Sequence, residues 1–226
     1  MARKKVRMTA IQRREQLIEV AQQVFAEQGF EATTVEEIAA RADVSKPVVY
    51  EHFGGKEGLY AVIVDPGVRT LLAALEDALH SPAPARLIAE RAALALLDFI
   101  EEEPDTFRIL VRDVPANQGG PSFSSVLGAV AMQTETLLGE QFKRADYSAE
   151  WAPMYAQMLV GSVAQVGQWW LEAQEPSKHE VAAHVVNLTW YGMKGLRRAP
   201  TLRTSSSDAP ADNVDPNSPK REHTGT

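Results

Sequence analysis

The chain has 226 residues, and its 45% hydrophobic content is enough for a core in one large or two small domains. It has no cysteine, which excludes disulfides and thiolate metal sites. The apolar stretch of most interest, at 92–100, contains an aspartate and is far shorter than the ~20 residues of a membrane-spanning helix. The net charge of −7 argues against a nucleic-acid partner unless the basic residues are concentrated at one end.

The charge is distributed unevenly along the chain. Residues 1–56 carry nine Lys or Arg and eight Asp or Glu, whereas residues 57–226 carry 14 and 22. Six basic residues and no acidic residue fall within the first fourteen positions. This asymmetry is expected when one end meets phosphates, although a solvated basic tail would look the same. Because no apolar stretch follows, the beginning does not look like a signal peptide; we expect a flexible basic arm at 1–10 in a cytoplasmic protein without a membrane partner.

The first predicted helix runs from about residue 10 to residue 27. Leu17, Val24 and Phe25 recur at helical spacing with charged residues opposite them. Gly29 follows where a helix needs a residue that tolerates a left-handed conformation. We therefore expect an amphipathic helix that ends just before Gly29.

Two shorter helices are predicted next. Thr34, with Glu37 three residues later, has the spacing of a capping box and predicts a helix start. Residues 42–43 indicate a tight turn, after which Ser45 can cap a third helix whose first turn accepts Pro47. Three short helices, the last two joined by a tight turn, predict a helix-turn-helix unit at 11–56.

The third helix has more exposed chemistry than a small core requires. Val49 and Phe53 are four residues apart and share the inner face with Val44. The outer face then carries a lysine, a tyrosine and a histidine beside the positive end of the helix dipole, groups that suit phosphates and base edges. The residue types alone would also fit an ordinary surface helix; the capped helix and turn before them favour DNA reading.

The remainder of the chain is helical in pattern. A helix starting at Lys56 is expected to kink or break near Val64, because Asp65-Pro66-Gly67 removes a backbone hydrogen bond. Further helical patterns lie at 84–102, 105–113, 122–144, 149–174 and 178–198, and no strand pattern is long enough to count. We predict an all-α fold with a helical ligand-binding and dimerisation domain at 57–198 and a disordered tail at 199–226.

Residues 13–64, which include the paired threonines, "IAARADVS", the Tyr-x-x-Phe pair and the following Lys-Glu, resemble the TetR family of bacterial transcriptional repressors. The resemblance implies a homodimer that binds a palindromic double-stranded operator and is released by a small molecule. It places Lys46, Pro47 and Tyr50 near bases, and Thr34, Val48, His52 and Lys56 at or near the DNA backbone. One departure is the Asp65-Pro66-Gly67 interruption, since many relatives have a more continuous fourth helix.

The second domain should hold an effector pocket between the helices of 84–144 and the front of 149–174. Apolar residues such as Leu137 and polar residues on neighbouring helices are expected to line it. The selected pocket residues are Leu97, Phe107, Arg108, Arg112, Gln133, Gln157 and Gln165. For each apolar residue a plain core position is the alternative, and the two arginines could equally form internal ion pairs. The second domain also resembles an actinobacterial branch of the family, some of whose members respond to long-chain acyl-CoA.

The last two long helices are expected to form the dimer interface. Met154, Met158, Gly161 and Gln165 form one stripe, and the large aromatic residues nearby are favoured interface anchors. The selected interface residues are Trp170, Val181, Val185, Leu188, Gly192 and Leu196. An intramolecular core is the alternative for each of them.

Catalysis is not expected. The five histidines have no metal-ligand spacing, and no phosphate-binding loop or nucleophile motif is present, so we predict no catalytic residue, metal or cofactor. A regulator without an inducer, an activator or a repressor with a collapsed pocket are the alternatives to an inducible repressor. A helical protein-interaction module is a third class, which would bind DNA without sequence preference.

Overall fold

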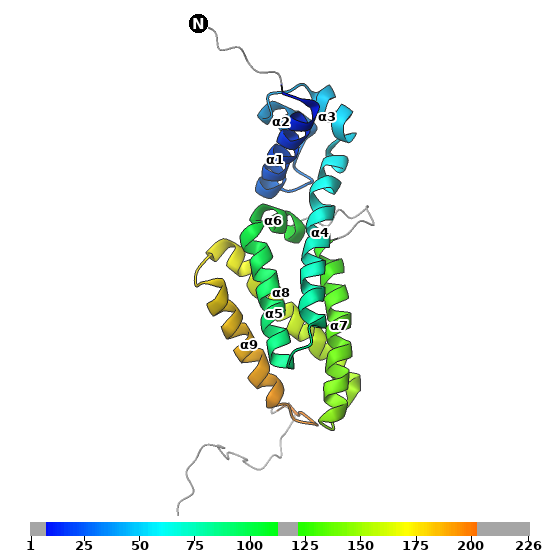
Figure 1. The fold of residues 1–226 in the computed structure, drawn as a ribbon, viewed down its shortest axis with the longest axis vertical. Helices are drawn as coiled ribbons and strands as arrows, with labels where there is room; N and C mark the ends of the chain where they lie inside the picture. Colours follow the sequence, from blue (N-terminus) through cyan, green and yellow to red (C-terminus); the bar gives the residue numbers. More distant parts are fainter. Residues whose placement is uncertain (1–7, 113–121, 203–226) are drawn as a thin grey trace, which may run out of the picture.

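The computed structural model describes residues 8–112 and 122–202, and within these ranges all regular structure is helical. The all-α prediction is therefore confirmed. The helices are α1 (Ala10–Gln28), α2 (Val35–Arg41), α3 (Lys46–Phe53), α4 (Lys56–His80), α5 (Ala85–Glu102), α6 (Pro104–Arg112), α7 (Phe123–Arg144), α8 (Ala152–Ala173) and α9 (Lys178–Lys194), with a 3-10 turn at Ala149–Trp151 before α8. Figure 1 shows α1–α3 at one end, a longer bundle below, and α4 running from one into the other.

The small end domain begins with a well-formed helix start. The Thr9 side chain accepts a hydrogen bond from the Gln12 backbone N–H at 3.2 Å, and the Gln12 side chain accepts one from Thr9 at 3.0 Å. Leu17, Val24 and Phe25 of α1 are fully buried, as their spacing predicted. Gly29 ends α1 with φ at 85°, a value that favours glycine.

The turn between α2 and α3 has the predicted position but not all of the predicted hydrogen bonds. Thr34 caps α2 by accepting from the Glu37 N–H at 3.2 Å, while the Glu37 carboxylate bonds to Gln28 and Arg41 instead of returning to Thr34. Ser45 occupies the N-cap position of α3 without a side-chain hydrogen bond. Half of the capping box and the Ser45 cap were therefore predicted wrongly.

Pro66 lies inside α4 without breaking it. The helix is continuous over 25 residues, so a break at this position is wrong, while the kink that was the other expectation stays a prediction. Ile63, Val64, Val68 and Leu71 on both sides of the proline are buried. Burying each such side chain stabilises by about 1.5–3 kcal/mol, and together they outweigh the roughly 3 kcal/mol that an interior proline costs.

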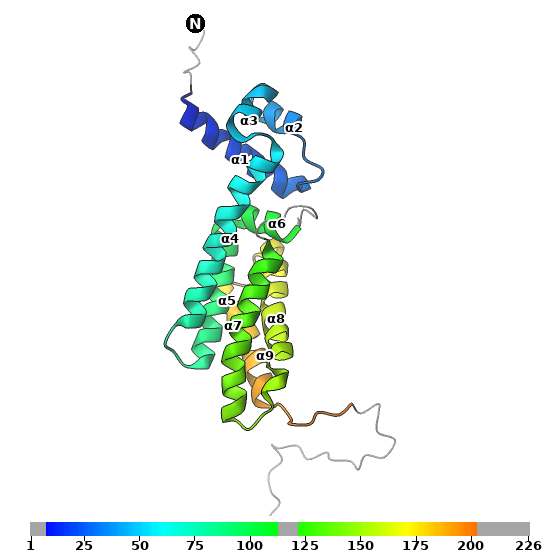
Figure 2. The ribbon, with the colours of Figure 1, turned by 90° about the vertical axis from the view of Figure 1, so that its right-hand side faces the viewer.

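The second domain is a bundle of long helices. α5 packs between α4 and α9, and α7 packs along α8 while also touching α4. Figure 2 shows α7 and α8 side by side in the view turned by 90°, with α6 across the end nearest to α1. Lys178 fastens the start of α9 to α5 through ion pairs with Asp98, at 2.8 Å, and Glu101. The hydrogen bond to Asp98, which has the larger effect, and the one to Glu101 both raise the pKa of Lys178.

The last helix is shorter than predicted. It ends at Lys194 instead of continuing to 198, because Gly195 follows and its N–H bonds back to the carbonyls of the final turn. Leu196 therefore lies beyond the helix. The predicted basic arm at 1–10 and the predicted tail at 199–226 lie mostly outside the described residues.

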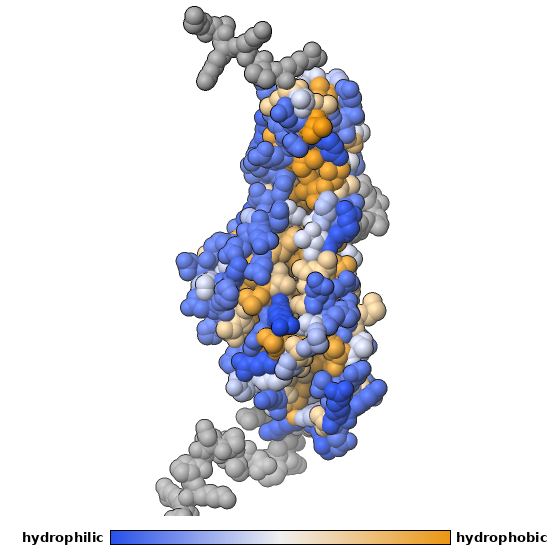
Figure 3. Space-filling model, viewed as in Figure 1, coloured by the Kyte–Doolittle hydropathy of each residue, from blue (hydrophilic) through white to orange (hydrophobic). Residues whose placement is uncertain are grey.

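α4 is, within the described ranges, the helix that is long and apolar enough to cross a membrane by length and composition. Of its most apolar window, 44% is buried inside the fold, and the core helix of a soluble protein passes the same test. In the view of Figure 3, polar residues cover most of the surface, with strips of apolar residues between them.

Candidate DNA-binding surface and ligand cavity

The position of α3 is fixed from its inner side. Val49 is fully buried, and Val48 and Phe53 pack partly buried against the same core. The Arg14 guanidinium of α1 lies 4.7 Å from the centre of the Phe53 ring. Gly54 then ends the helix in the left-handed conformation, with φ at 75°. These contacts hold α3 at the exposed end of the molecule seen in Figure 1.

Three of the predicted base-contacting side chains lie together on the outer face of α3. Lys46 and Pro47 are exposed, and Tyr50 keeps 46% of its surface exposed. Lys46 forms an ion pair with Glu36 of α2, and its ammonium lies 5.7 Å from the centre of the Tyr50 ring. The hydrogen bond between Lys46 and Glu36 raises the pKa of Lys46 and lowers the pKa of Glu36. Both groups are therefore charged at neutral pH, and the Glu36 carboxylate partly neutralises the charge that Lys46 would offer to DNA.

The other four predicted residues are more involved in the domain itself. Val48 and His52 are half-buried, and the His52 ring lies 6.1 Å from that of Phe53. Thr34 uses its oxygen to cap α2. Lys56 donates to two backbone carbonyls of the α1–α2 loop, of Phe30 at 3.0 Å and of Thr33 at 3.2 Å. An ammonium has three donors, so one remains for a phosphate.

A cavity of about 620 Å³ lies inside the second domain. Its wall is built from the end of α4, the first half of α5, most of α7, the middle of α8 and the second half of α9. The lining is almost entirely aliphatic and aromatic, including Leu75, Ile88, Ala92, Phe123, Leu127, Leu137, Val163 and Trp190. Size and lining are typical of a small-molecule site.

The cavity was predicted in the right region but with the wrong side chains. Among the apolar candidates, Leu137 does line it, whereas none of the seven selected pocket residues does. Leu97 and Phe107 are buried in the solid core, and Gln157 and Gln165 are exposed on α8. Gln133 faces α4, where its amide lies 3.4 Å from Glu76. A helical pattern locates apolar faces but does not show which of them are left unfilled.

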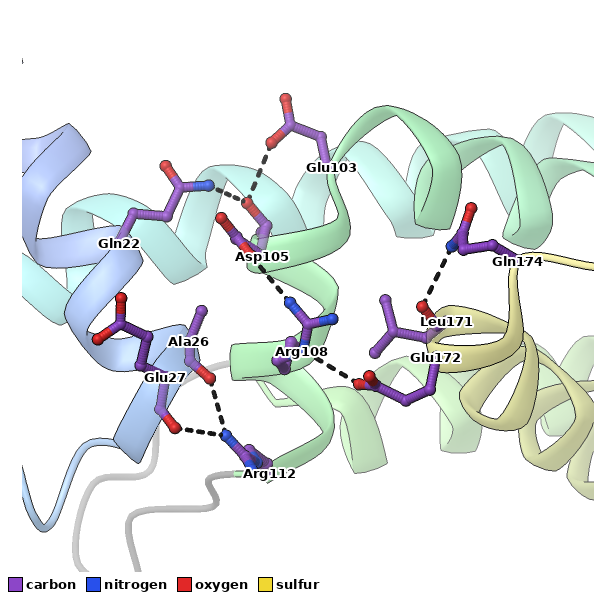
Figure 4. Close-up of polar contacts among 11 residues, drawn as sticks. Gln22, Ala26, Glu27, Glu103, Asp105, Arg108, Arg112, Leu171, Glu172 and Gln174 are labelled. Carbon is purple, nitrogen blue, oxygen red and sulfur yellow. Dashed lines mark hydrogen bonds and ion pairs between the residues drawn. The ribbon is translucent and has the colours of Figure 1, made fainter.

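Neither arginine lines the cavity. Arg112 connects the two domains, whereas Arg108 joins α6 to α8 within the second domain (Figure 4). Arg112 donates to the backbone carbonyls of Ala26, at 2.8 Å, and Glu27, at 3.0 Å, near the end of α1. Arg108 bonds to Asp105 at 2.9 Å and to Glu172 of α8 at 3.1 Å. The internal ion-pair alternative was thus correct for Arg108. For Arg112, the partner is a helix end of the other domain, which carries partial negative charge.

The junction between α6 and α1 has a further polar link, and α6 also makes a close contact with α4. Gln22 of α1 donates to the Thr106 hydroxyl at 3.0 Å, and that hydroxyl donates to Glu103 at 3.1 Å. A Cβ atom added to Gly67 of α4 would lie 2.4 Å from the Thr106 methyl carbon. α6 therefore contacts α1 through hydrogen bonds and α4 through tight packing.

The predicted interface residues fall into three groups. Trp170 and Val181 are buried within the chain, and the Trp170 indole N–H donates to the Pro176 carbonyl at 2.7 Å. Val185 and Leu196 line the cavity. Only Leu188, which is 76% exposed, and Gly192 face outward among the six selected. The first four therefore lie on inner surfaces of the single chain, because an apolar stripe does not distinguish an inner from an outer face.

A large apolar surface nevertheless remains on these two helices. On α8, the exposed residues Met154, Met158, Gly161, Gln165 and Trp169 follow one another at steps of three or four. On α9, Leu188, Tyr191 and Gly192 are exposed, and no atom lies within 4 Å of a Cβ added at Gly161 or Gly192. We call these eight residues the α8–α9 face.

The described residues contain no group of three His, Asp or Glu side chains that could hold a metal ion. The candidate site therefore consists of the exposed helix α3, an apolar cavity and the α6 junction between them. This arrangement is that of a helix-turn-helix transcriptional regulator with a second, helical domain.

Comparison with known proteins specifies the family. Residues 17–63 match the model of "Bacterial regulatory proteins, tetR family", and residues 74–201 match "Tetracyclin repressor-like, C-terminal domain". The chain therefore belongs to the TetR family. As a member it is a transcriptional regulator and not an enzyme.

Individual relatives differ in the direction of control. The chain is 29% identical over 192 residues to the HTH-type transcriptional activator FasR of Mycolicibacterium smegmatis, covering 83% of this chain and 85% of FasR. It is 40% identical over 90 residues to the HTH-type transcriptional repressor Rv3405c of Mycobacterium tuberculosis, covering 36% and 45%. The structure of the ketosteroid regulator KstR2 of M. tuberculosis shares the fold, with a TM-score of 0.66 at 20% identity over 80% of this chain and 94% of that one.

Proposed function

We propose that this protein is a cytoplasmic repressor that binds a palindromic operator as a homodimer and is released by a small lipid-like effector. The observation that supports inducibility most strongly is the apolar cavity of about 620 Å³ in the second domain. A regulator without an inducer would have this space filled by side chains.

DNA reading is assigned to the outer face of α3. Tyr50 and Pro47 are exposed for contact with base edges and methyl groups, and Lys46, which has one carboxylate partner and three donors, can also donate to a base or a phosphate. Thr34, Val48, His52 and Lys56 remain proposed backbone-side contacts. The half-buried positions of Val48 and His52 favour a supporting role for these two.

The α8–α9 face is the proposed dimer interface. It combines exposed methionine and aromatic side chains with two glycines that let a partner backbone approach closely. Exposed apolar surfaces of this kind are unusual in a monomer and are typical of interfaces. A two-fold dimer presents two reading helices, as a palindromic operator requires.

A line of packed contacts leads from the cavity to the DNA-binding domain. Phe123 lines the cavity, and its ring packs edge-on against Phe107 of α6 with the centroids 5.3 Å apart. α6 in turn holds α1 through Arg112 and packs on α4 at Gly67. A ligand that displaces Phe123 would shift α6 and, in each protomer of the dimer, the DNA-binding domain that α6 contacts.

The effector is proposed to be predominantly apolar because the lining is. Long-chain acyl-CoA, to which some relatives of this branch respond, is one such molecule. An activator is the second candidate function, since the relative that covers 83% of the chain is an activator.

Transcription in vitro separates the two signs of control. A promoter carrying the operator should be silenced by the protein and restored by effector, whereas an activator would raise transcription. Gel-shift titration with the same DNA tests release: affinity should fall when effector is added. Unchanged operator affinity with bound effector would reject the inducible mechanism.

A further inference from the structure

One end of the cavity carries a positive charge that forms no ion pair with the residues the structure describes. Within the described part of the lining, Lys194 is the charged residue, and it is the last residue of α9. Its ammonium lies 5.5 Å from the centre of the Trp190 ring and forms no ion pair with any described residue. The charge is therefore available to a ligand.

The other polar groups of the lining are mostly occupied. The hydroxyls of Thr134 and Thr189 donate to carbonyls of their own helices, to Val130 at 2.8 Å and to Val185 at 2.9 Å. The Tyr147 hydroxyl donates to the Leu196 carbonyl. A ligand would thus meet apolar surface along most of its length and find an unengaged cation at Lys194.

The charge and the apolar end of the cavity lie at opposite ends of the bundle. Lys194 ends α9, and Gln141, which also lines the cavity, lies in the last turn of α7. Phe123, the first residue of α7, also lines the cavity. Along the axis of α7 it lies about 27 Å from Gln141, at 1.5 Å per residue. The lining therefore suits an elongated molecule with one polar end.

We propose that Lys194 anchors the anionic head group, a carboxylate or a phosphate, of a single-chain amphiphile whose alkyl chain points toward Phe123. The inference rests on the proposed effector function and specifies its ligand. A buried chain gains affinity by leaving water, while the ammonium selects an ionised head over a neutral one of equal length. The chain end then presses on the residue that contacts α6.

Arg86 provides a matched control. It follows the cavity-lining residue Ala85 near the start of α5, so it is a cation close to the same wall. Unlike Lys194, it is already paired, with Glu90 at 3.0 Å. Removing its charge should not affect ligand binding if Lys194 acts as a specific anchor.

The test compares decanoate with 1-decanol, below their micelle concentrations at pH 7.5, on the full-length protein. Calorimetry and the fluorescence of Trp190, which lies in the lining, report binding. Lys194→Met keeps an apolar stem and should weaken decanoate binding about tenfold, as expected for a charge-assisted contact, while leaving decanol binding unchanged. Lys194→Arg should restore it, and Arg86→Met should have no effect.

Decanoyl-coenzyme A distinguishes the two head groups, because its only anions are phosphates. A loss in Lys194→Met confined to decanoate assigns a carboxylate, and a loss confined to the thioester assigns a phosphate. Equal loss for decanol, equal loss in Arg86→Met, or no loss for either anion would overturn the anchor. Decanoate is too short to reach Phe123, so the release assay uses oleate, whose chain is nearly twice as long. Oleate that binds through Lys194 without releasing the operator would reject the proposed function and leave the anchor standing.

Discussion

Replacing Gly67 by alanine tests the close contact between α4 and α6. The added Cβ would lie 2.4 Å from the Thr106 methyl carbon, whereas carbon atoms in contact are about 3.5–4.0 Å apart. The two helices must therefore separate by about 1 Å or distort. Overpacking of this kind costs about 1–3 kcal/mol, while alanine inside a helix gains about 1 kcal/mol over glycine.

Gly128→Ala isolates the helix-propensity gain. Gly128 lies in α7, is exposed, and has no atom within 4 Å of an added Cβ. The free energy of unfolding of Gly67→Ala should therefore be about 1–3 kcal/mol below that of Gly128→Ala. At about 2–4 °C per kcal/mol for a chain of this size, their melting temperatures should differ by about 2–12 °C at equal protein concentration.

A second substitution identifies the clashing atom. Thr106→Ser removes the methyl group and keeps the hydroxyl that joins Gln22 and Glu103. In the double variant, Gly67→Ala should lose most of its destabilisation, measured as a coupling energy in a double-mutant cycle. Equal melting temperatures for Gly67→Ala and Gly128→Ala would refute the close packing of α4 on α6.

Four further variants test the remaining sites. Tyr50→Ala should lower specific operator affinity at least tenfold in gel shifts while melting unchanged, because the side chain is 46% exposed; equal affinity would remove α3 as the reading helix. Lys56→Met should weaken binding to all DNA alike, reduce the salt slope by about one, and destabilise by about 1–3 kcal/mol through two lost carbonyl contacts; a change at one base position would contradict this. Leu188→Glu should yield monomers in sedimentation, and an intact dimer would exclude the α8–α9 face. Val163→Trp should fill the cavity and abolish effector binding in calorimetry without loss of operator binding; retained effector affinity would place the ligand elsewhere.

The DNA-binding domain was predictable because its signals are local. Thr34 caps α2, Gly29 ends α1, and Val49 is buried, as spacing and residue type indicated. The break expected at Pro66 is absent for the opposite reason. The helix is stabilised by buried side chains on both sides of the proline, and such tertiary packing is not visible in the local sequence.

The cavity and the junction depend on how helices meet. Arg112 looked like a ligand contact because its partners, two backbone carbonyls at the end of α1, carry no sequence signature. One signal was available for the cavity: Ala85, Ala89 and Ala92 place small side chains at helical spacing on α5, which leaves space beside a large partner. Val185 and Trp170 show that a stripe alone does not tell an interface from a core.

Footprinting of the full-length protein on the intergenic DNA beside its own gene tests most directly whether α3 reads a duplex. We predict two protected half-sites about 34–36 Å apart, centre to centre, with affinity that falls steeply as salt increases. Protection of no preferred sequence at modest ionic strength would contradict the assignment of α3, and with it the operator, the dimer geometry and the effector.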